Sequence, residues 1–284
     1  MLLRGSIYAL GSSAFFMPHS FYTEPSFHIE IYEILTCTDW AEAGADACFL
    51  LERFRNITGP ILELGCGSGR AAIPLAEAGF EVHGLDASSA MLSVARAKQE
   101  RLPAPVATRL FLTQGNMRKF EFAIQFGGVY STFRSFQHLL SAEDQESCLS
   151  CIHRHMRPDG ILVLNLFDPL YDLLLPGERQ GVISSRVVTH PISRNPVRIE
   201  VLRRVNDPLS QCFAETWRFT ELGPDNSTVV RQEEETLKMR WTFRYEMCHL
   251  LRLCGFRVLE EYSDFKKSPP VYGKEQVWIA AKGR

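Results

Sequence analysis

Hydrophobic and polar positions along the first two thirds of the chain follow two alternating patterns. Short apolar runs typical of buried strands are each followed by a stretch with the 3.6-residue period of an amphipathic helix. Strands that alternate with helices predict right-handed parallel crossovers, and therefore an α/β fold with a doubly wound, mostly parallel sheet. The strands predicted in this way are Ile61–Leu64, 81–86, 109–114, 128–133 and 161–167, and the helices are 71–78, 89–100 and 142–156.

Residues with special backbone or capping properties mark where several of these helices begin and end. Gly79 closes the first helix, because glycine readily adopts the left-handed conformation at a helix end. Ser88 can cap the second helix, since its hydroxyl accepts a bond from an otherwise unpaired N–H group. The sequence RPDG at 157–160 predicts a turn that ends the third helix.

The pattern changes after the fifth strand. Apolar and charged residues then alternate with a period of two in three segments, with turn residues between them. The segments 197–205, Cys212–Leu222 and 228–239 therefore predict an antiparallel β-meander inserted after the fifth core strand. The helix and strands that are expected to complete the core are 244–254, 257–263 and 276–282.

The composition is that of an ordinary globular protein with ample material for a core. The chain has 284 residues, of which 45% are hydrophobic and 23% charged, and its formal net charge is −2. This length fits one large domain or one domain with a sizeable insertion. Without a basic surplus we expect no nucleic-acid partner, and without an apolar run of about 18 residues we expect no membrane association.

Eight cysteines are scattered along the chain rather than grouped as in a small disulfide-linked scaffold. Cys148 and Cys151 have the spacing of a metal or redox pair, but no second pair at zinc spacing accompanies them. They also lie on a predicted helix, where cysteine packs as a small hydrophobic residue. We therefore predict free thiols, no metal site and a cytoplasmic protein.

Three glycines follow the first core strand, at Gly65, Gly67 and Gly69. A glycine-rich turn between a strand and a helix allows a ligand to touch backbone N–H groups. The dinucleotide pattern G-x-G-x-x-G would need its third glycine where Arg70 stands, so that pattern is broken. No lysine follows as in a P-loop, which excludes that motif too.

The sequence ELGCGSG at 63–69 instead resembles the first motif of the class I S-adenosylmethionine-dependent methyltransferases. Asp86 ends the second strand, where this family has the acidic residue that holds both ribose hydroxyls. The sequence then continues as is usual in the family, with Ala87 and Met91 in the positions that flank the adenine. Gly-Asn-Met at 115–117 resembles the adenine-side turn of the family, in which Asp is common at the second position.

The resemblance covers the chain from about residue 21 onward and implies a Rossmann-like fold with S-adenosyl-L-methionine as the cofactor. Glu63 is expected to reach the amino group of the cofactor indirectly, and Tyr22 either closes over the cofactor or packs in the core. The residues implied to bind the cofactor are Tyr22, Glu63, Gly65, Cys66, Gly67, Gly69, Asp86, Ala87, Met91, Asn116, Met117, Thr132 and Phe133.

The stretch after the fourth strand, STFRSFQHL at 131–139, bears on the methyl acceptor. It lacks the Asn/Asp-Pro-Pro-Tyr/Phe motif of many methyltransferases that modify nucleic-acid bases or glutamine amides. It resembles a branch that acts on amino sugars, amines or natural-product hydroxyls. Members of that branch have a β-insertion over the active site and an N-terminal aromatic lid, to which Phe21, Tyr22 and Tyr32 correspond.

Two polar residues in this stretch are candidates for contact with the acceptor. His138 is the best candidate for a catalytic base, because histidine titrates near neutral pH. The alternative is a histidine at the start of a helix that is bonded to the backbone. Arg134 either binds an acidic group of the substrate or pairs with a carboxylate of the protein.

The chain is thus interpreted as a methyltransferase that moves a methyl group to N or O of a small-molecule acceptor, as a monomer or homodimer. Two alternatives stay open, namely a protein or RNA methyltransferase and a non-catalytic cofactor-binding regulatory module. The resemblance implies an N-terminal extension at 1–20, a helical lid segment at 21–55, a cofactor-binding core at 56–168, a β-rich insertion on the substrate side at 169–241, and the C-terminal part of the core sheet at 242–284.

Overall fold

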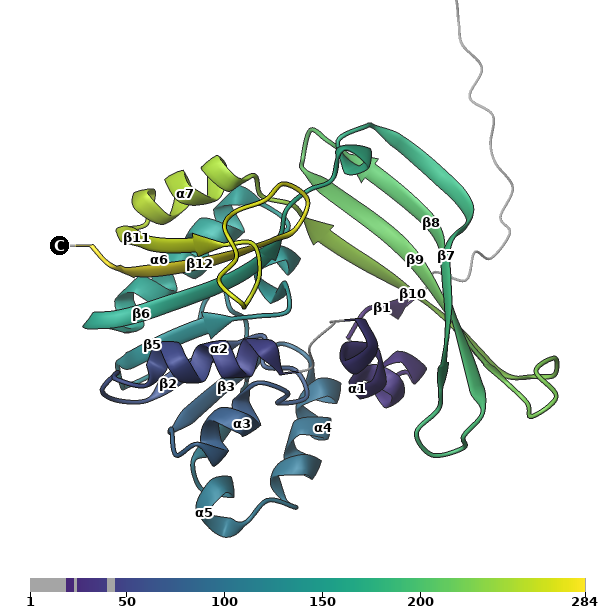
Figure 1. Cartoon of the computed structure of the whole chain (residues 1–284), viewed down its shortest axis with the longest axis horizontal. Helices are drawn as coiled ribbons and strands as arrows, with labels where there is room; N and C mark the ends of the chain where they lie inside the picture. The colour runs from purple at the N-terminus through teal and green to yellow at the C-terminus, as the bar shows by residue number, and fades with distance from the viewer. Residues whose placement is uncertain (1–18, 23–24, 40–43, 284) are drawn as a thin grey trace, which may run out of the picture.

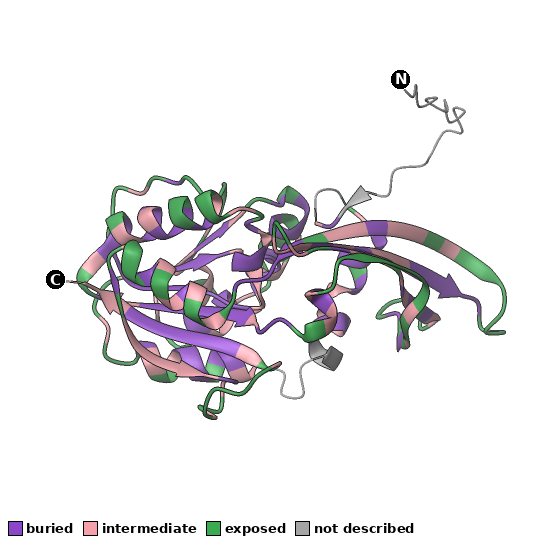
Figure 2. Ribbon diagram, turned by 90° about the horizontal axis from the view of Figure 1, so that it is seen from above, coloured by how far each residue is buried: buried purple, intermediate pink, exposed green. Residues whose placement is uncertain are grey.

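The structure is a computed structural model that describes residues 19–22, 25–39 and 44–283. Within these residues the chain forms a seven-stranded sheet covered by helices and a five-stranded sheet that projects from it (Figure 1). Seen from above, the far ends of the projecting strands are largely exposed, whereas the strands of the core sheet are largely buried (Figure 2). The expected extension at 1–20 lies almost wholly outside the described residues.

The seven-stranded sheet is the α/β core. Strands β6, β5, β2, β3 and β4 lie side by side in this order and run parallel, while β12 is antiparallel to both β6 and β11. The predicted doubly wound, mostly parallel sheet is thus confirmed. Its strands are β2 (Ile61–Leu64), β3 (Val82–Asp86), β4 (Leu110–Gln114), β5 (Phe126–Ser131), β6 (Met156–Phe167), β11 (Phe256–Tyr262) and β12 (Glu275–Lys282).

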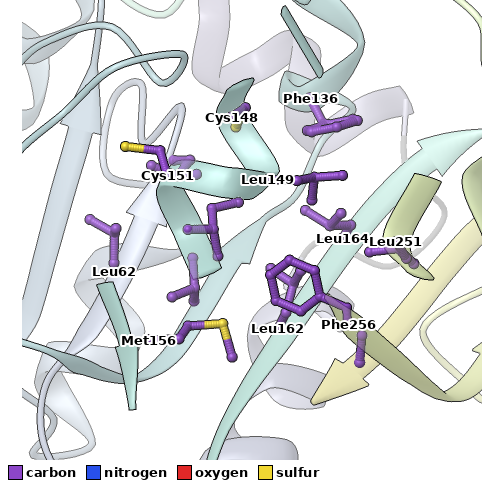
Figure 3. Packing of buried hydrophobic residues seen from close by; sticks show 14 of the residues in the cluster. Leu62, Phe136, Cys148, Leu149, Cys151, Met156, Leu162, Leu164, Leu251 and Phe256 are labelled. Carbon is purple, nitrogen blue, oxygen red and sulfur yellow. The ribbon is translucent and has the colours of Figure 1, made fainter. Parts of the chain in front are cut away.

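Helices cover both faces of this sheet, because neighbouring strand residues point to opposite sides. Leu162 packs with Cys148 and Leu149 of α6 and Leu251 of α7 (Figure 3), whereas Val163 packs with the residues of α2 and α3. The helices of the core are α2 (Ala45–Phe54), α3 (Ala72–Glu77), α4 (Ser89–Gln99), α5 (Ala104–Ala107), α6 (Ala142–His155) and α7 (Arg244–Leu253).

Two of the expected helix ends are confirmed by their local geometry. The Ser88 side chain accepts a hydrogen bond from the Met91 N–H group and begins α4. Gly79 follows the end of α3 with a φ angle of 101°. That angle lies in the left-handed region, which glycine adopts without a steric penalty.

The turn expected at 157–160 is wrong, because these residues belong to β6. Met156 lies opposite Phe126 and Ile161 opposite Gly128, so the four residues between them face only Gly127. They therefore form an irregularity within the strand. Proline and glycine predict a break in the chain direction, but here they accommodate extra residues in a continuous strand.

The strand expected at 128–133 also ends earlier than predicted, at Ser131. Phe133 and Arg134 have positive φ angles of 55° and 64°, which no strand allows. The chain then continues into the short 3-10 helix η1 (Ser135–His138). This sharp change of direction brings the residues after β5 to the carboxyl ends of the parallel strands.

The second sheet is the predicted insertion after the fifth core strand. Its four long strands are antiparallel, and a short N-terminal strand pairs parallel with the last of them. In spatial order the strands are β1 (His19–Ser20), β10 (Val229–Arg240), β9 (Cys212–Leu222), β8 (Pro196–Asp207) and β7 (Gly177–Thr189).

Strand β7 was not predicted. Nearly all of its residues are exposed, since it is an edge strand, so its sequence has no buried face to produce an alternating pattern. Strand β1 was not predicted either, because two residues carry no period.

Helix α1 (Phe27–Asp39) lies between the two sheets (Figure 1). Phe27, Ile31 and Leu35 pack against the second sheet, whereas Ile29 packs against Ala90 and Met91 of α4. The helix therefore contacts both halves of the molecule with different faces. The space left around it forms the cavities described next.

Candidate active site

The glycine turn after β2 is shaped by close contacts. Gly65 and Gly67 have φ angles of 73° and 52°. A Cβ atom on Gly65 would lie 2.5 Å from the Cβ of Ser135, and one on Gly67 would lie 3.1 Å from the terminal methyl of Met91. Both positions therefore exclude a side chain for reasons of conformation and of space.

Asp86 closes the same turn from the end of β3. Its two carboxylate oxygens accept hydrogen bonds from the N–H groups of Gly67, at 2.7 Å, and Ser88, at 2.8 Å. Burial raises the pKa of this carboxyl group, and the backbone N–H groups oppose that shift. A carboxylate has about four lone-pair positions, so Asp86 can also accept hydrogen bonds from a ligand.

A cavity of about 320 Å³ opens beside this turn at the carboxyl ends of β2, β3, β4 and β5. This cavity, which we call the cofactor cavity, has a polar end at Asp86 and an apolar wall of aromatic and methionine side chains. The lining residues are Phe21, Tyr22, Tyr32, Gly65, Gly67, Asp86, Ala87, Ser88, Ser89, Met91, Gln114, Met117, Phe133, Ser135 and His138.

Several residues expected to bind the cofactor do not line this cavity. The Sγ atom of Cys66 packs against Gly84 of β3, and burial raises the pKa of the thiol. Gly69 packs against Ile73 and Ala95. The buried Thr132 supplies its carbonyl oxygen to the N–H group of Ser135.

Asn116 also does not line the cofactor cavity. Its Oδ1 atom accepts hydrogen bonds from the backbone N–H and the guanidinium of Arg118, at 2.9 and 3.3 Å. The side chain thereby belongs to the outer surface around Lys119 and Asp144 rather than to the cofactor cavity.

Glu63 lies under the turn instead of in the cavity. It is buried, and the Tyr130 hydroxyl donates a hydrogen bond of 2.9 Å to its Oε2 atom. Burial raises the pKa of Glu63 to about 8, although Tyr130 and the Arg70 guanidinium oppose the shift. Arg70 itself forms an ion pair with Asp46 at the start of α2. Glu63, Tyr130, Arg70 and Asp46 therefore form a row of polar groups between the turn and helix α2.

A second cavity, of about 430 Å³, lies between α1, η1 and the projecting sheet. We call it the acceptor cavity. It is lined by Phe21, Tyr22, His28, Tyr32, Leu35, Thr36, Phe133, Arg134, His138, Arg186, Trp217, Phe219, Leu237, Met239 and Glu275. Five of these residues also line the cofactor cavity, namely Phe21, Tyr22, Tyr32, Phe133 and His138. The two cavities therefore share one wall.

His138 stands in this shared wall at the end of η1. Its ring packs edge-on to the ring of Tyr22, with 5.7 Å between the centroids. Burial lowers the pKa of His138 to about 4, and a hydrogen bond with the backbone of Lys238 opposes this shift. The imidazole is therefore neutral at pH 7, and it is bonded to the backbone while also lining the acceptor cavity.

Tyr22 links the shared wall to helix α1. Its backbone has a φ angle of 65°, and its ring meets Phe21 at 5.4 Å and Tyr32 at 6.0 Å between centroids. Burial raises the pKa values of both tyrosines well above their usual range, so their hydroxyls stay protonated at neutral pH. Both can donate hydrogen bonds into the cavities.

Arg134 already has a carboxylate partner within the protein. Its guanidinium lies 2.6 Å from Oε1 of Glu275 and over the ring of Phe167. The other oxygen of Glu275 accepts a hydrogen bond of 2.9 Å from Asn165. This arrangement favours the second of the two interpretations offered for Arg134, pairing with a carboxylate of the chain.

Sequence reasoning missed several residues of both cavities. Gln114 lies outside the matched motifs, and Ser135 lies within the stretch 131–139 but was not singled out there; only the fold brings both to the turn. His28 had a signal that was not used: it lies four residues before Tyr32, and such spacing puts two side chains on one face of a helix. Trp217 and Phe219 likewise share one face of the predicted strand Cys212–Leu222.

Two further findings concern the part of the chain that the structure describes. No helix there is long and apolar enough to span a lipid bilayer. In the same residues no three His, Cys, Asp or Glu side chains are grouped to hold a metal ion.

Comparison with known families and sequences gives consistent matches. The family model of the methyltransferase domain matches residues 61–160. A dTDP-3-amino-3,6-dideoxy-alpha-D-glucopyranose N,N-dimethyltransferase of Streptomyces fradiae is 30% identical over 214 residues, which are 73% of this chain and 74% of that protein. A glycine/sarcosine N-methyltransferase of Aphanothece halophytica is 33% identical over 210 residues, 73% of this chain and 70% of its own.

Solved structures match almost the whole fold, including the second sheet. The CcbJ methyltransferase from Streptomyces caelestis superposes with a TM-score of 0.72 at 19% identity, covering 93% of this chain and 99% of that one. DesVI from Streptomyces venezuelae gives a TM-score of 0.71 at 20% identity, covering 91% and 99%. At these identities the likeness concerns the fold.

Proposed function

Since the chain belongs to the class I S-adenosylmethionine-dependent methyltransferases, we propose that it transfers a methyl group to a nitrogen or oxygen atom of a small-molecule acceptor. S-adenosylmethionine is the cofactor of this enzyme. The observation that carries the proposal is the shared wall, because it brings an acceptor in one cavity within reach of a methyl donor in the other.

The residues of the cofactor cavity fit S-adenosylmethionine. Gly65 and Gly67 line the cavity without side chains, and the Asp86 carboxylate can accept hydrogen bonds from the ribose hydroxyls. Ala87 and Met91 offer apolar contacts for the adenine ring. S-adenosylmethionine supplies an electrophilic methyl group on a sulfonium ion.

The main contribution of the chain to methyl transfer is position. Holding a nucleophile in line with an electrophile can supply about 7–11 kcal/mol of the barrier. Tyr22, Phe133 and Tyr32 form an apolar partition around the point where the two cavities meet. Their rings also exclude water, which would otherwise solvate the attacking atom.

His138 is proposed as the proton acceptor for the acceptor group. A hydroxyl or ammonium must lose its proton as the methyl group arrives, and a neutral imidazole can take it. The lowered pKa keeps His138 in the neutral form, although it also makes the imidazole a weak base. This role therefore needs the direct test given in the Discussion.

The acceptor is more consistent with an amine than with other groups. The sugar N,N-dimethyltransferase and the glycine/sarcosine N-methyltransferase are both named for transfer to nitrogen. The acceptor cavity of about 430 Å³ also suits a small molecule better than a folded protein or RNA. The described cysteines are free thiols, which supports a cytoplasmic location, and we propose a monomer or homodimer.

A labelled-methyl assay tests this function. The enzyme is incubated with S-adenosylmethionine carrying a tritiated methyl group and with separate panels of small amines, alcohols, phenols and carboxylic acids. We expect transfer to members of the amine panel and release of S-adenosylhomocysteine. The Asp86→Ala enzyme serves as the control for enzyme-dependent transfer. Labelling of added protein or RNA, with none of the small molecules labelled, would contradict the proposal.

A further inference from the structure

A buried carboxylate lies at the edge of the acceptor cavity. Glu235 of β10 is only 1% exposed, and neither of its oxygens has a hydrogen-bond partner among the described residues. A buried carboxylate is normally bonded, paired with a cation or protonated, because removing its charge from water is costly. Glu235 therefore requires an explanation.

Glu235 points toward the cavity side of the projecting sheet. Side chains two positions apart in a strand share a face, and Leu237 and Met239 line the acceptor cavity. In register, Glu235 lies opposite Trp217, which also lines the cavity. The carboxylate thus lies at the end of the cavity that is walled by aromatic rings.

His28 of α1 is the nearest group that can carry a positive charge. Its Nδ1 atom lies 3.7 Å from Oε2 of Glu235, and the side chains are 4% and 1% exposed. That distance is too long for a hydrogen bond, so neither Glu235 oxygen is bonded by His28. His28 also lines the acceptor cavity. Since its Nδ1 atom faces Glu235, the Nε2 side of the ring faces that cavity.

Aromatic rings surround this pair. The ring of His28 stacks on Phe219 at 5.2 Å and packs against Phe21 at 4.5 Å and Tyr22 at 5.0 Å between centroids. The faces of aromatic rings attract cations, and such cages bind ammonium groups. A carboxylate behind an aromatic cage therefore has the composition of an ammonium site.

The other charged groups around the cavity do not neutralise Glu235. Arg134 pairs with Glu275, and at the outer end of α1 Arg231 pairs with Glu30 and Glu233. Arg186 lies on β7, which is separated from β10 by β8 and β9.

The titratable groups packed nearest to His28 are uncharged at neutral pH. Burial raises the pKa values of Tyr22 and Tyr32 and lowers that of His138. Burial also lowers the pKa of the Arg186 guanidinium at the distant edge. Glu235 and His28 are thus the ionisable groups that lie together at this end.

We propose that Glu235 makes this end of the acceptor cavity a binding site for a cationic amine. This inference rests on the proposed function and narrows its acceptor to an amine that enters as an ammonium ion.

Two probes of equal shape test the site without an identified acceptor. Choline carries a permanent positive charge, whereas 3,3-dimethylbutan-1-ol has carbon in place of its nitrogen. Calorimetry is done on the enzyme saturated with S-adenosylhomocysteine. We expect choline to bind at least about tenfold more tightly than the neutral alcohol. In the Glu235→Gln enzyme this preference should fall to within about threefold, with unchanged affinity for the alcohol.

A matched control is the Glu234→Gln enzyme. Glu234 is the neighbouring residue on the opposite face of β10, where it pairs with Arg218 at 2.7 Å. The substitution makes the same change in net charge, but it should leave the preference for choline intact. Equal loss of preference in both variants would show a general effect of charge and would overturn the proposal.

The outcomes separate this inference from the proposed function. If choline and the alcohol bind equally well, the cation site is refuted while a small-molecule cavity remains. If neither binds while S-adenosylhomocysteine still does, both the inference and the small-molecule function are contradicted.

Discussion

The cofactor cavity and the acceptor cavity share a wall but are built in different ways. The cofactor cavity is made largely by turns at the ends of adjacent parallel strands, where Gly65, Gly67 and Asp86 lie within about 20 residues of one another. The acceptor cavity takes its side chains from α1, η1, the projecting sheet and β12. The cofactor cavity is thus built largely from local turns, and the acceptor cavity from side chains that the fold collects from distant segments.

The largest expected effect tests the shared wall. His138→Ala should lower turnover by about 10²–10⁴-fold, the usual contribution of a positioned base, while S-adenosylhomocysteine affinity stays nearly unchanged. The wild-type rate should also fall as the pH drops through about 4, because the His138 imidazole becomes protonated there and can no longer accept a proton. Steady-state rates with an acceptor found by the labelled-methyl assay, together with calorimetry, measure both effects. Turnover within a few-fold of the wild type would remove His138 from catalysis and leave the methyltransferase assignment intact.

A change in the cofactor cavity should have the opposite signature. Asp86→Ala should weaken S-adenosylhomocysteine binding at least about tenfold, because charge-assisted hydrogen bonds contribute roughly 1.5–3 kcal/mol each. Calorimetry on the folded variant measures this effect. Asp159→Ala is the control, since Asp159 is exposed and lies far along β6. Unchanged affinity in the Asp86 variant would assign Asp86 to holding the turn alone.

The stability of the folded protein should depend on pH through Glu63, which lies under the glycine turn. Its pKa is raised from 4.5 to about 8 in the folded protein, so the folded state holds this proton more tightly than the unfolded chain does. The stability that this bound proton gives to the folded state is fully present below about pH 4.5 and is lost as the pH rises through about 8. The melting temperature of the wild type should therefore fall over this range relative to that of Glu63→Gln. Parallel pH curves for the two proteins would contradict the buried, protonated carboxyl group.

The smallest effect is expected at Arg134, on the acceptor side. Its partner Glu275 belongs to the chain and the guanidinium is partly exposed. Such an ion pair contributes about 0–1 kcal/mol to the stability of the folded protein. Arg134→Gln should change KM for the acceptor by no more than a few-fold. Initial-rate measurements over a range of acceptor concentrations decide this. A rise of about a hundredfold in KM would restore the interpretation that Arg134 binds an acidic group of the substrate.

The elements of the core could be predicted because their residues meet the solvent on one side only or not at all. The period of two or 3.6 that results is visible in the sequence, and Ser88 and Gly79 mark helix ends by local chemistry. Strand β7 was not predicted because it has no buried face, and its sequence therefore shows no alternating pattern. The RPDG segment was misread because proline and glycine allow a strand irregularity as well as a turn.

The candidate site divides along the same line. Turn residues such as Gly65 and Asp86 follow from motif spacing, and they line the cofactor cavity. Motif spacing also selects Asn116, but its side chain is bonded to Arg118 instead of lining the cavity. Motif spacing does not show such a competing local partner. The pairing of His28 with Glu235 joins residues about 200 positions apart, and no pattern within either segment reveals it.

The parallel pair between β1 and β10 has a consequence for the order in which the protein is made. His19 lies opposite Glu235, so one of the first described residues waits for a strand that the ribosome adds about 200 residues later. At about 5–20 residues per second, that delay lasts roughly 10–40 seconds. During this time the strands β2 to β5 that carry the glycine turn have already been synthesised. The nascent chain can therefore form its cofactor turn well before Phe21 and Tyr22 are fixed over it by β10.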